Sequence, residues 1–266
     1  MNRILVTGGT GNLGKAIVAL LIKNNCDVTV LTSQNYLPTT NHVSYTYGNL
    51  AIANSLSGLE NAFDIIIHCA SNALNTAAID IEGSQNLISA ISTSRIKHFI
   101  YISIVGVDQS SFDYYKSKVY VEDFLIASGL PYSIIRATQF HDFIYHWLIK
   151  PIDTGLENNL QIPSDLYFQS IDKNDVARKV LELTTLGPIN KTINIGGPEV
   201  LKFEQMAEAY LFLLKRQNKI EFVPPISEMH RLFTTKINLC PRAKYGKISW
   251  CDYLRQTLVA DSKPIL

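Results

Sequence analysis

Short apolar runs alternate with amphipathic stretches through the first half of the chain, and the two patterns predict different elements. Apolar runs of this length predict buried strands, and they occupy residues 3–7, 28–32, 43–47, 64–69, 98–103 and 132–136. Between these runs, apolar residues recur at the spacing of one helix face. Strands that alternate with helices form a parallel sheet with helices on both faces. The pattern therefore predicts an α/β fold built on a doubly wound parallel sheet.

Individual helices are marked by their apolar positions or by their ends. The apolar face of the first is formed by Leu13, Ile17, Leu20 and Leu21, and that of the fourth by Ile79, Gly83, Leu87 and Ile91. The fifth helix, near residues 114–127, is predicted to end at Gly129, because Pro131 follows it closely.

After Arg136 the alternation loosens, although a helix at about 175–183 and a strand at 192–195 are still predicted. We predict a core domain over residues 1–150 and a smaller C-terminal lobe over residues 151–266, packed on the core and partly interleaved with it. Ligands of parallel sheets lie beyond the carboxyl ends of the strands. The smaller lobe is therefore the expected side of a substrate cleft.

A glycine-rich turn joins the first strand to the first helix, and residues 7–14 read TGGTGNLG. Such a turn exposes backbone N–H groups at a helix N-terminus, where the helix dipole favours a pyrophosphate. Gly8, Gly11 and Gly14 lack a Cβ atom, which allows close approach of the backbone and close packing of helix on strand. A purely structural turn is the alternative. The order of strand, turn and helix predicts a dinucleotide site and a sheet of the Rossmann type.

Composition and charge narrow the classes of partner. The 266 residues are 47% hydrophobic, which is enough for one large domain or one with a small appendage. A formal net charge of +1 provides no general attraction to nucleic acid or anionic lipid, so we expect neither partner. The apolar runs are too short to cross a membrane, and the first strand leaves no room for a signal peptide.

The cysteines and histidines indicate neither disulfides nor a metal site. The four cysteines are scattered without a CxxC pair, and the six histidines show no HxxxH or HxH spacing. We therefore expect a cytoplasmic protein with reduced thiols and no bound metal.

Tyr114 and Lys118 form a Tyr-x-x-x-Lys pair in the helix that follows the fifth strand. A spacing of four places the phenol and the ammonium on one helix face. There the lysine would lower the pKa of the phenol and hold a ribose hydroxyl, while the tyrosine protonates a carbonyl oxygen as a hydride arrives. An exposed helix that happens to carry a tyrosine and lysines would show the same spacing.

Further segments extend this pattern to nearly the whole chain. They read HCAS at 68–71, GSQNL at 83–87, YISIVGV at 101–107, RATQF at 136–140, DVA at 175–177, NIGGPE at 194–199 and WCDYL at 250–254. With the glycine turn and the Tyr–Lys pair, the chain resembles the short-chain dehydrogenase/reductase superfamily. Within it, the chain resembles the atypical NmrA-like branch, which includes NAD(P)H-binding quinone reductases and redox-sensing regulators.

The resemblance implies roles for particular residues. It implies that residues 10–13 contact the pyrophosphate, that Ala70 and Ser71 border the adenosine ribose, and that Asn49 and Leu50 edge the adenine. The full set expected to bind the cofactor is Gly8, Thr10, Gly11, Asn12, Leu13, Gly14, Thr32, Ser33, Asn49, Leu50, Ala70, Ser71, Ser103 and Lys118. Tyr114 and Lys118 are the expected catalytic residues.

The chain departs from the family pattern at several of these positions. Asn49 replaces a more usual aspartate, although its amide oxygen can still accept a hydrogen bond from the adenine amino group. Ser103 stands too early for the catalytic serine, and Asp80 stands where many relatives have a helix asparagine. The Tyr–Lys pair is thus present without its helpers. Hydride delivery to an easily reduced acceptor is therefore favoured over alcohol oxidation.

The end of the second strand bears on the choice of cofactor. NAD enzymes commonly carry an acidic residue there that binds both ribose hydroxyls. Here Thr32, Ser33 and Gln34 provide no carboxylate to repel a 2′-phosphate, and Ser33, Gln34 and Arg3 are candidate hydrogen-bond donors. An ordinary polar loop would read the same way. We expect NADP(H) in preference to NAD(H).

An aromatic segment at 139–147 follows the sixth strand, where the resemblance places the nicotinamide and the substrate. Flat apolar walls with few polar groups suit an aromatic or quinone-like acceptor, and Phe140 and His141 are the expected substrate contacts. Aromatic clusters also form ordinary cores, and His146 is expected to be structural or exposed.

Three functions fit this pattern. The first is an NAD(P)H-dependent oxidoreductase that delivers hydride to a quinone-like or carbonyl acceptor. The second is an NmrA-like regulator that senses the dinucleotide without turnover, and the third is a catalytically inactive assembly factor that retains its cofactor. The incomplete catalytic set supports the second, and the third differs from it in showing no discrimination between the redox forms.

Overall fold

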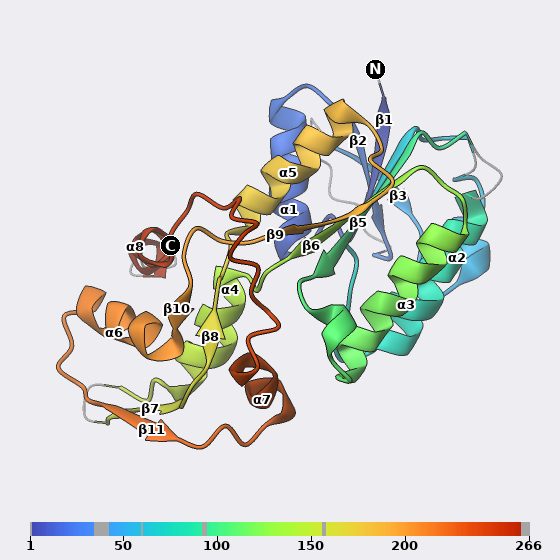
Figure 1. Cartoon of the computed structure of the whole chain (residues 1–266). Helices are drawn as coiled ribbons and strands as arrows, with labels where there is room; N and C mark the ends of the chain where they lie inside the picture. Colours follow the sequence, from blue (N-terminus) through green and yellow to red (C-terminus); the bar gives the residue numbers. More distant parts are fainter. Residues whose placement is uncertain (1, 35–42, 60, 92–94, 156–157, 262–266) are drawn as a thin grey trace. The chain divides into compact units, whose positions relative to one another are not determined.

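The computed structural model describes residues 2–34, 43–59, 61–91, 95–155 and 158–261 (Figure 1). Its central feature is a seven-stranded sheet in the order β3-β2-β1-β4-β5-β6-β9. The strands are β1 (Arg3–Thr7), β2 (Asp27–Thr32), β3 (Ser44–Tyr47), β4 (Ile65–His68), β5 (His98–Ile104), β6 (Tyr132–Ala137) and β9 (Thr192–Ile195). The order of the first six is that of the Rossmann fold. The predicted α/β class is therefore confirmed.

The strands pair in parallel register where the sequence predicts buried runs. β1 pairs with β2 from Arg3 opposite Asp27, and with β4 from Ile4 opposite Ile65. β2 also pairs in parallel with β3, and β4 with β5. β4 is buried along its whole length, as a strand covered on both faces must be.

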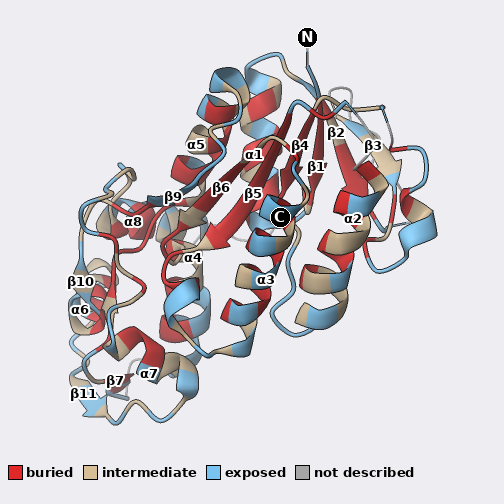
Figure 2. Ribbon diagram, turned by 45° about the vertical axis from the view of Figure 1, so that its right-hand side comes forward, coloured by how far each residue is buried: buried red, intermediate tan, exposed pale blue. Residues whose placement is uncertain are grey.

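Helices cover both faces of the sheet. Figure 1 shows α1 and α5 on one side and α2 and α3 on the other. Their bounds are α1 (Asn12–Lys23), α2 (Gly83–Ile91), α3 (Asp113–Ala127) and α5 (Lys173–Leu186). Between the helices and the sheet, the buried residues form continuous layers (Figure 2). The predicted end of the helix near residues 114–127 agrees with the structure, because α3 ends at Ala127 and Gly129 follows it with a positive φ of 72°.

The contacts of the chain group into two compact units, each made of separated stretches. The first comprises 1–103, 110–136 and 176–193, and the second comprises 104–109, 137–175 and 194–266. The sequence predicts a single boundary at residue 150, and its division into a cofactor-binding core and a substrate lobe stays a prediction. No helix within the described ranges is long and apolar enough to cross a membrane.

The second unit is built from short elements around aromatic side chains. It contains α4 (His141–Phe143), a π-helix (η4, Ile144–Ile149), a 3-10 turn (η5, Lys150–Ile152), α6 (Phe203–Leu213), α7 (Glu228–Thr234) and α8 (Trp250–Asp261). β7 (Leu160–Pro163) pairs in parallel with β11 (Ile220–Val223), and β8 (Tyr167–Phe168) pairs antiparallel with β10 (Leu201–Lys202).

A nearly buried ion pair ties α3 to the sheet inside the first unit. The guanidinium of Arg136 on β6 binds the carboxylate of Glu122 on α3, with Nε 3.0 Å from Oε1 and Nη2 2.6 Å from Oε2. The Glu122 side chain is 3% exposed and that of Arg136 is 15% exposed. The two parallel N–H···O bonds compensate for removing both charges from water.

We expect Glu122→Ala to lower the free energy of unfolding by about 3–5 kcal/mol, because it removes the carboxylate that offsets the largely buried Arg136 charge. Urea denaturation of the purified protein measures the change. The control is Asp113→Ala, which removes the exposed ion pair of Lys116 with Asp113 on the same helix and should cost less than about 1 kcal/mol. Equal costs for the two substitutions would contradict this account of Arg136.

Candidate functional site

The glycine turn is packed so closely that two of its glycines have no room for a side chain. A Cβ atom on Gly14 would lie 2.0 Å from the carbonyl oxygen of Gly8. Gly8 itself has a φ of 68°, and a Cβ atom there would lie 2.6 Å from the backbone nitrogen of Ala70. The turn therefore brings the end of β1 against the segment that follows β4.

The N-terminus of α1 is suited to an anion. Gly11 is the N-cap, no side chain among the described residues caps the helix there, and its first turn carries no acidic residue. Thr10, Gly11 and Asn12 are exposed, while Leu13 and Gly14 are buried. These features leave the positive end of the helix dipole open to a pyrophosphate.

The residues expected at the adenine are partly engaged with their own backbone. The amide oxygen of Asn49 accepts a hydrogen bond from the Ala51 N–H at 3.0 Å, so one of its acceptor positions is already used. Leu50 is buried, and its carbonyl oxygen accepts a hydrogen bond from Asn86 at 2.8 Å.

The end of β2 provides hydroxyl groups and no carboxylate up to Gln34. Thr32 is buried and its Oγ1 accepts a hydrogen bond from the Gln34 N–H at 3.2 Å, while Ser33 is exposed. Arg3, which the sequence analysis proposes as a donor near this position, lies at the amino-terminal end of the strands, whereas Ser33 follows the carboxyl end of β2. Arg3 pairs with Asp27 at the start of β2, and its Nη2 donates to the carbonyl of Asn61 at 3.0 Å. The prediction that Arg3 donates near Ser33 is wrong. Because β1 and β2 are parallel, Arg3 at the start of β1 lies beside the start of β2, and Ser33 lies beyond its far end.

Lys118 and Asp80 form a buried ion pair beside Tyr114. The Lys118 Nζ lies 3.0 Å from Asp80 Oδ1, and the two side chains are only 4% and 1% exposed. The ammonium also lies over two rings, 5.4 Å from the centroid of Tyr101 and 5.5 Å from that of Tyr114. The structure thus brings Tyr114 and Lys118 together, as the spacing predicts, and adds a carboxylate.

Opposing effects act on the charge of Lys118. Burial on its own lowers the pKa of the ammonium, whereas its interactions with Tyr101, Tyr114 and Asp80 raise it. The raising effects are larger, so the pKa of Lys118 lies above its ordinary value. Lys118 is therefore a cation at neutral pH, and Asp80 is its counter-ion.

The hydrogen bonds around Asp80 have a defined direction. Asp80 Oδ1 accepts from the Ser71 hydroxyl at 2.6 Å, and Oδ2 accepts from the Asn72 N–H at 2.9 Å. Since Ser71 donates its hydroxyl proton to Asp80, its oxygen accepts from the Tyr114 hydroxyl, which lies 2.9 Å away. The Tyr114 proton therefore points towards Ser71.

A second chain of hydrogen bonds connects Asp80 to the end of β1 through His68. The Ser84 hydroxyl donates to the backbone carbonyl of Asp80, so it accepts from Nε2–H of His68, 2.9 Å away. Nδ1 of His68 then accepts from the Thr7 hydroxyl at 2.6 Å. Burial, followed by the nearby Lys118 charge, lowers the pKa of His68 to about 3. The ring is therefore neutral.

Asp80 reaches this position from a π-helix. Residues Thr76–Glu82 form the element η2, which continues directly into α2. Single π-turns of this kind often occur at functional sites. The sequence identifies Asp80 only as a departure from the family asparagine, and His68 only as part of a motif. Their partners lie too far along the chain to be found from local spacing.

The Ser103 side chain is buried, and its hydroxyl has no hydrogen-bond partner among the described residues. It lies near the carboxyl end of β5, where Ile104 ends the strand. Its role as a cofactor contact stays a prediction.

The two expected substrate contacts belong to the second unit. His141 is fully buried, with Nε2–H donating to the Ile248 carbonyl at 3.0 Å and Nδ1 accepting from the Ser170 hydroxyl at 2.8 Å. Burial lowers the pKa of His141. Both ring nitrogens are used, so we assign His141 to the packing of its unit rather than to a substrate. Phe140 is half-buried, and its backbone pairs with Ile171.

Two other expectations concern histidines and metals. His146 is exposed, as expected for a structural or surface residue. Over the part of the chain that the structure describes, no group of His, Cys, Asp or Glu side chains is arranged to hold a metal ion.

Comparison with known proteins defines the class. A profile of the NAD(P)H-binding family matches residues 8–185, which include the glycine turn, Asp80, Tyr114 and Lys118. The chain therefore belongs to the NAD(P)H-binding family.

Individual relatives carry more specific names. The photosystem II assembly factor Ycf39 of Trieres chinensis is 24% identical over 263 residues, which cover 92% of this chain and 81% of that protein. Ycf39 of Synechocystis sp. is 30% identical over 199 residues, covering 66% of this chain and 60% of that protein.

Solved structures share the fold. A nucleoside-diphosphate-sugar epimerase from Staphylococcus aureus superposes with a TM-score of 0.74 at 17% identity, covering 95% of this chain and 99% of that one. The Bordetella bronchiseptica enzyme WbmH, in complex with NAD+, gives a TM-score of 0.70 at 14% identity, covering 85% and 87%. At these identities the likeness extends to the fold alone.

We expect His68 to make the protein less stable in mild acid. Between pH 6.5 and about 3 the unfolded chain binds a proton at His68 that the folded chain does not, so stability falls as the pH falls. The loss from this group is about 1.4 kcal/mol per pH unit within that range. Urea denaturation from pH 6.5 to 4.5 should give a shallower dependence for His68→Gln, which cannot titrate. Equal slopes would contradict a neutral, buried His68.

Proposed function

We propose that the chain is an NADP(H)-dependent oxidoreductase of the atypical short-chain dehydrogenase/reductase type, acting on a quinone-like or carbonyl acceptor. The observation that carries this proposal is the position of Tyr114. Its hydroxyl bonds Ser71, the residue after Ala70, and Ala70 is the backbone against which Gly8 is packed. A proton donor thus lies next to the turn that holds the dinucleotide.

The cofactor supplies the hydride, and this chain supplies the proton. The acceptor carbon or ring takes the hydride, and its oxygen takes the proton of Tyr114, which yields an alcohol or a hydroquinone. Ser71 is exposed and hydrogen-bonded to the Tyr114 oxygen, so it offers a route for the return of a proton from water. Asp80 offsets the charge of Lys118, so the ion pair brings no net positive charge to the Tyr114 hydroxyl.

The preference for NADP(H) is supported by the end of β2, where Thr32, Ser33 and Gln34 bring no carboxylate against a 2′-phosphate. The net charge of +1 supports action on a small molecule, without a nucleic-acid or membrane partner, and the four scattered cysteines support a reducing, cytoplasmic environment.

The same cluster also favours a second function, that of an NmrA-like regulator that senses the dinucleotide without turnover. The Lys118 charge is already paired, the Tyr114 hydroxyl already donates a hydrogen bond to Ser71, and Ser103 stands too early for the catalytic serine. The relatives named as photosystem II assembly factors add support for a role without catalysis. An inactive assembly factor would differ from a sensor in binding both redox forms equally.

We expect purified protein to oxidise NADPH steadily in the presence of at least one member of a panel of quinones, aldehydes and azo dyes. Tyr114→Phe should lower the turnover by roughly 100-fold, because it removes the proton donor, while NADPH binding changes little. The matched control is Tyr120→Phe on the same helix, whose hydroxyl accepts from Gln85 at 2.8 Å, and it should keep its turnover. Absorbance at the reduced nicotinamide band measures the rate.

The binding constants separate the alternatives. Tight dinucleotide binding without oxidation of NADPH or NADH by any acceptor would rule out the oxidoreductase. In that case a clear difference in affinity between NADP+ and NADPH that persists in Tyr114→Phe indicates a sensor. Equal affinities indicate an assembly factor.

A further inference from the structure

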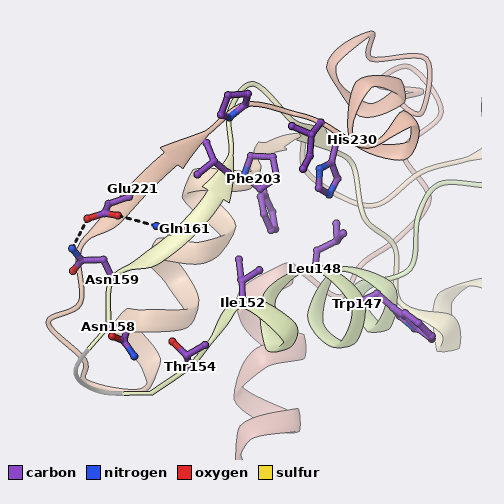
Figure 3. A pocket seen from close by; sticks show the side chains of 14 residues that line it. Trp147, Leu148, Ile152, Thr154, Asn158, Asn159, Gln161, Phe203, Glu221 and His230 are labelled. Atoms are coloured by element: carbon purple, nitrogen blue, oxygen red, sulfur yellow. Dashed lines mark hydrogen bonds between the residues drawn. The ribbon is translucent and has the colours of Figure 1, made fainter.

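A cavity of about 1180 Å³ lies within the second unit and takes no part in the Tyr114 cluster (Figure 3). Its walls are the parallel pair β7 and β11, the turn of η4 and η5, the start of α6, and α7. A volume of this size is somewhat larger than the roughly 300–1,000 Å³ of most small-molecule sites.

The walls of the cavity are fixed by polar contacts. Next to the lining residue Thr154, the carboxylate of Asp153 binds Nη1 of Arg216 at 2.6 and 2.7 Å. On the strand pair, the Glu221 carboxylate accepts from Asn159 at 2.6 Å and from Gln161 at 3.4 Å (Figure 3). The cavity is therefore a preformed feature of the described chain.

The inside of the cavity is mainly apolar, and its apolar lining extends to the surface. Leu148 and Phe203 are buried in the unit and line the cavity, and the Phe203 ring points into it (Figure 3). Two large lining residues, Trp147 and Ile226, are 69% and 75% exposed. Apolar surface gathered around a cavity is typical of a site that a ligand covers.

The charge of the lining excludes one class of ligand. The fourteen residues that line the cavity in the described chain include the Glu221 carboxylate and no lysine or arginine. A phosphate or carboxylate would meet a negative charge without a compensating cation. The ligand should therefore not be an anion.

His230 provides a polar contact inside this apolar site. Burial lowers the pKa of His230, so its ring is neutral at neutral pH. Its Nδ1 is buried and has no hydrogen-bond partner among the residues that the structure describes. The ring itself lines the cavity, and a ligand hydroxyl suits either tautomer of a neutral imidazole because a hydroxyl both donates and accepts.

We propose that the second unit binds an uncharged amphiphile, with a hydrocarbon body against Leu148, Phe203 and Ile226 and a hydroxyl at His230. The apolar lining suits the hydrocarbon body, the lone carboxylate disfavours an anionic head, and the neutral His230 ring suits a hydroxyl. The site is independent of the proposed reaction, because no residue of the Tyr114 cluster contributes to it.

The tryptophans of the chain allow a direct test without dinucleotide or acceptor. Trp147 lines the cavity, whereas Trp250 is fully buried elsewhere in the unit and serves as an internal reference. Farnesol should change the Trp147 emission saturably. Farnesyl diphosphate, which has the same chain and an anionic head, should bind at least about tenfold more weakly. Trp147→Phe should lose most of the emission change while calorimetry still detects binding.

A pair of exposed positions provides the matched variants. Ile226→Glu places a charge at the cavity, and it should weaken farnesol binding by about tenfold or more. Phe212→Glu makes a similar change at a 79% exposed position on α6 outside the lining, and it should stay within about twofold. Both sites are exposed, so the fold should persist, and the Trp250 emission reports it.

Several results would overturn the proposal. One is the absence of saturable binding of farnesol by both fluorescence and calorimetry. Another is binding of farnesyl diphosphate as tight as that of farnesol, which would indicate an anion site. Equal losses in Ile226→Glu and Phe212→Glu would place the ligand outside the cavity. None of these results depends on NADPH oxidation.

Discussion

The buried ion pair of Lys118 with Asp80 is the constraint on which the candidate site depends. An ammonium removed from water is strongly unfavourable unless an opposite charge lies beside it. Asp80 Oδ1 lies 3.0 Å from that ammonium, and the same carboxylate also binds Ser71 and the Asn72 N–H. The π-helix is therefore held against α3, and the segment after β4 is held against both.

This pair also sets the electrostatics of Tyr114. An unpaired Lys118 cation would stabilise a negative phenolate oxygen, which is the effect expected from the Tyr-x-x-x-Lys spacing. With Asp80 beside Lys118, the ion pair has no net charge, and the Tyr114 hydroxyl donates a hydrogen bond to Ser71. The second chain of bonds, from Asp80 through Ser84 and His68 to Thr7, connects this balance to the end of β1. Tyr114 and the end of β1, where the glycine turn begins, are thus connected through one polar network.

Much of the first unit follows from local pattern. Runs of apolar residues predict β1, β2, β4, β5 and β6 because a strand covered on both faces must be apolar, and the helix spacing predicts the face of α1. The outer strand β3 is predicted from a less apolar run, and its residues are half-buried or exposed. The glycine turn could be read from sequence because Gly8 and Gly14 occupy positions where a Cβ atom would clash with backbone. The proximity of Tyr114 and Lys118 is equally local, since residues four apart share a helix face.

By itself, the sequence determined the α/β class, the glycine turn and the Tyr114–Lys118 pair, because each depends on patterns among residues that are close together along the chain. The tertiary structure alone decided that Asp80 neutralises Lys118, that Ser71 accepts from Tyr114, and that His141 is packed with both nitrogens used. It also placed Arg3 at the opposite end of the parallel strands from Ser33, and it formed the cavity that Phe203 lines. The physical reason is that a buried polar group takes its partner from whichever segment the fold brings close, and sequence distance does not specify that segment.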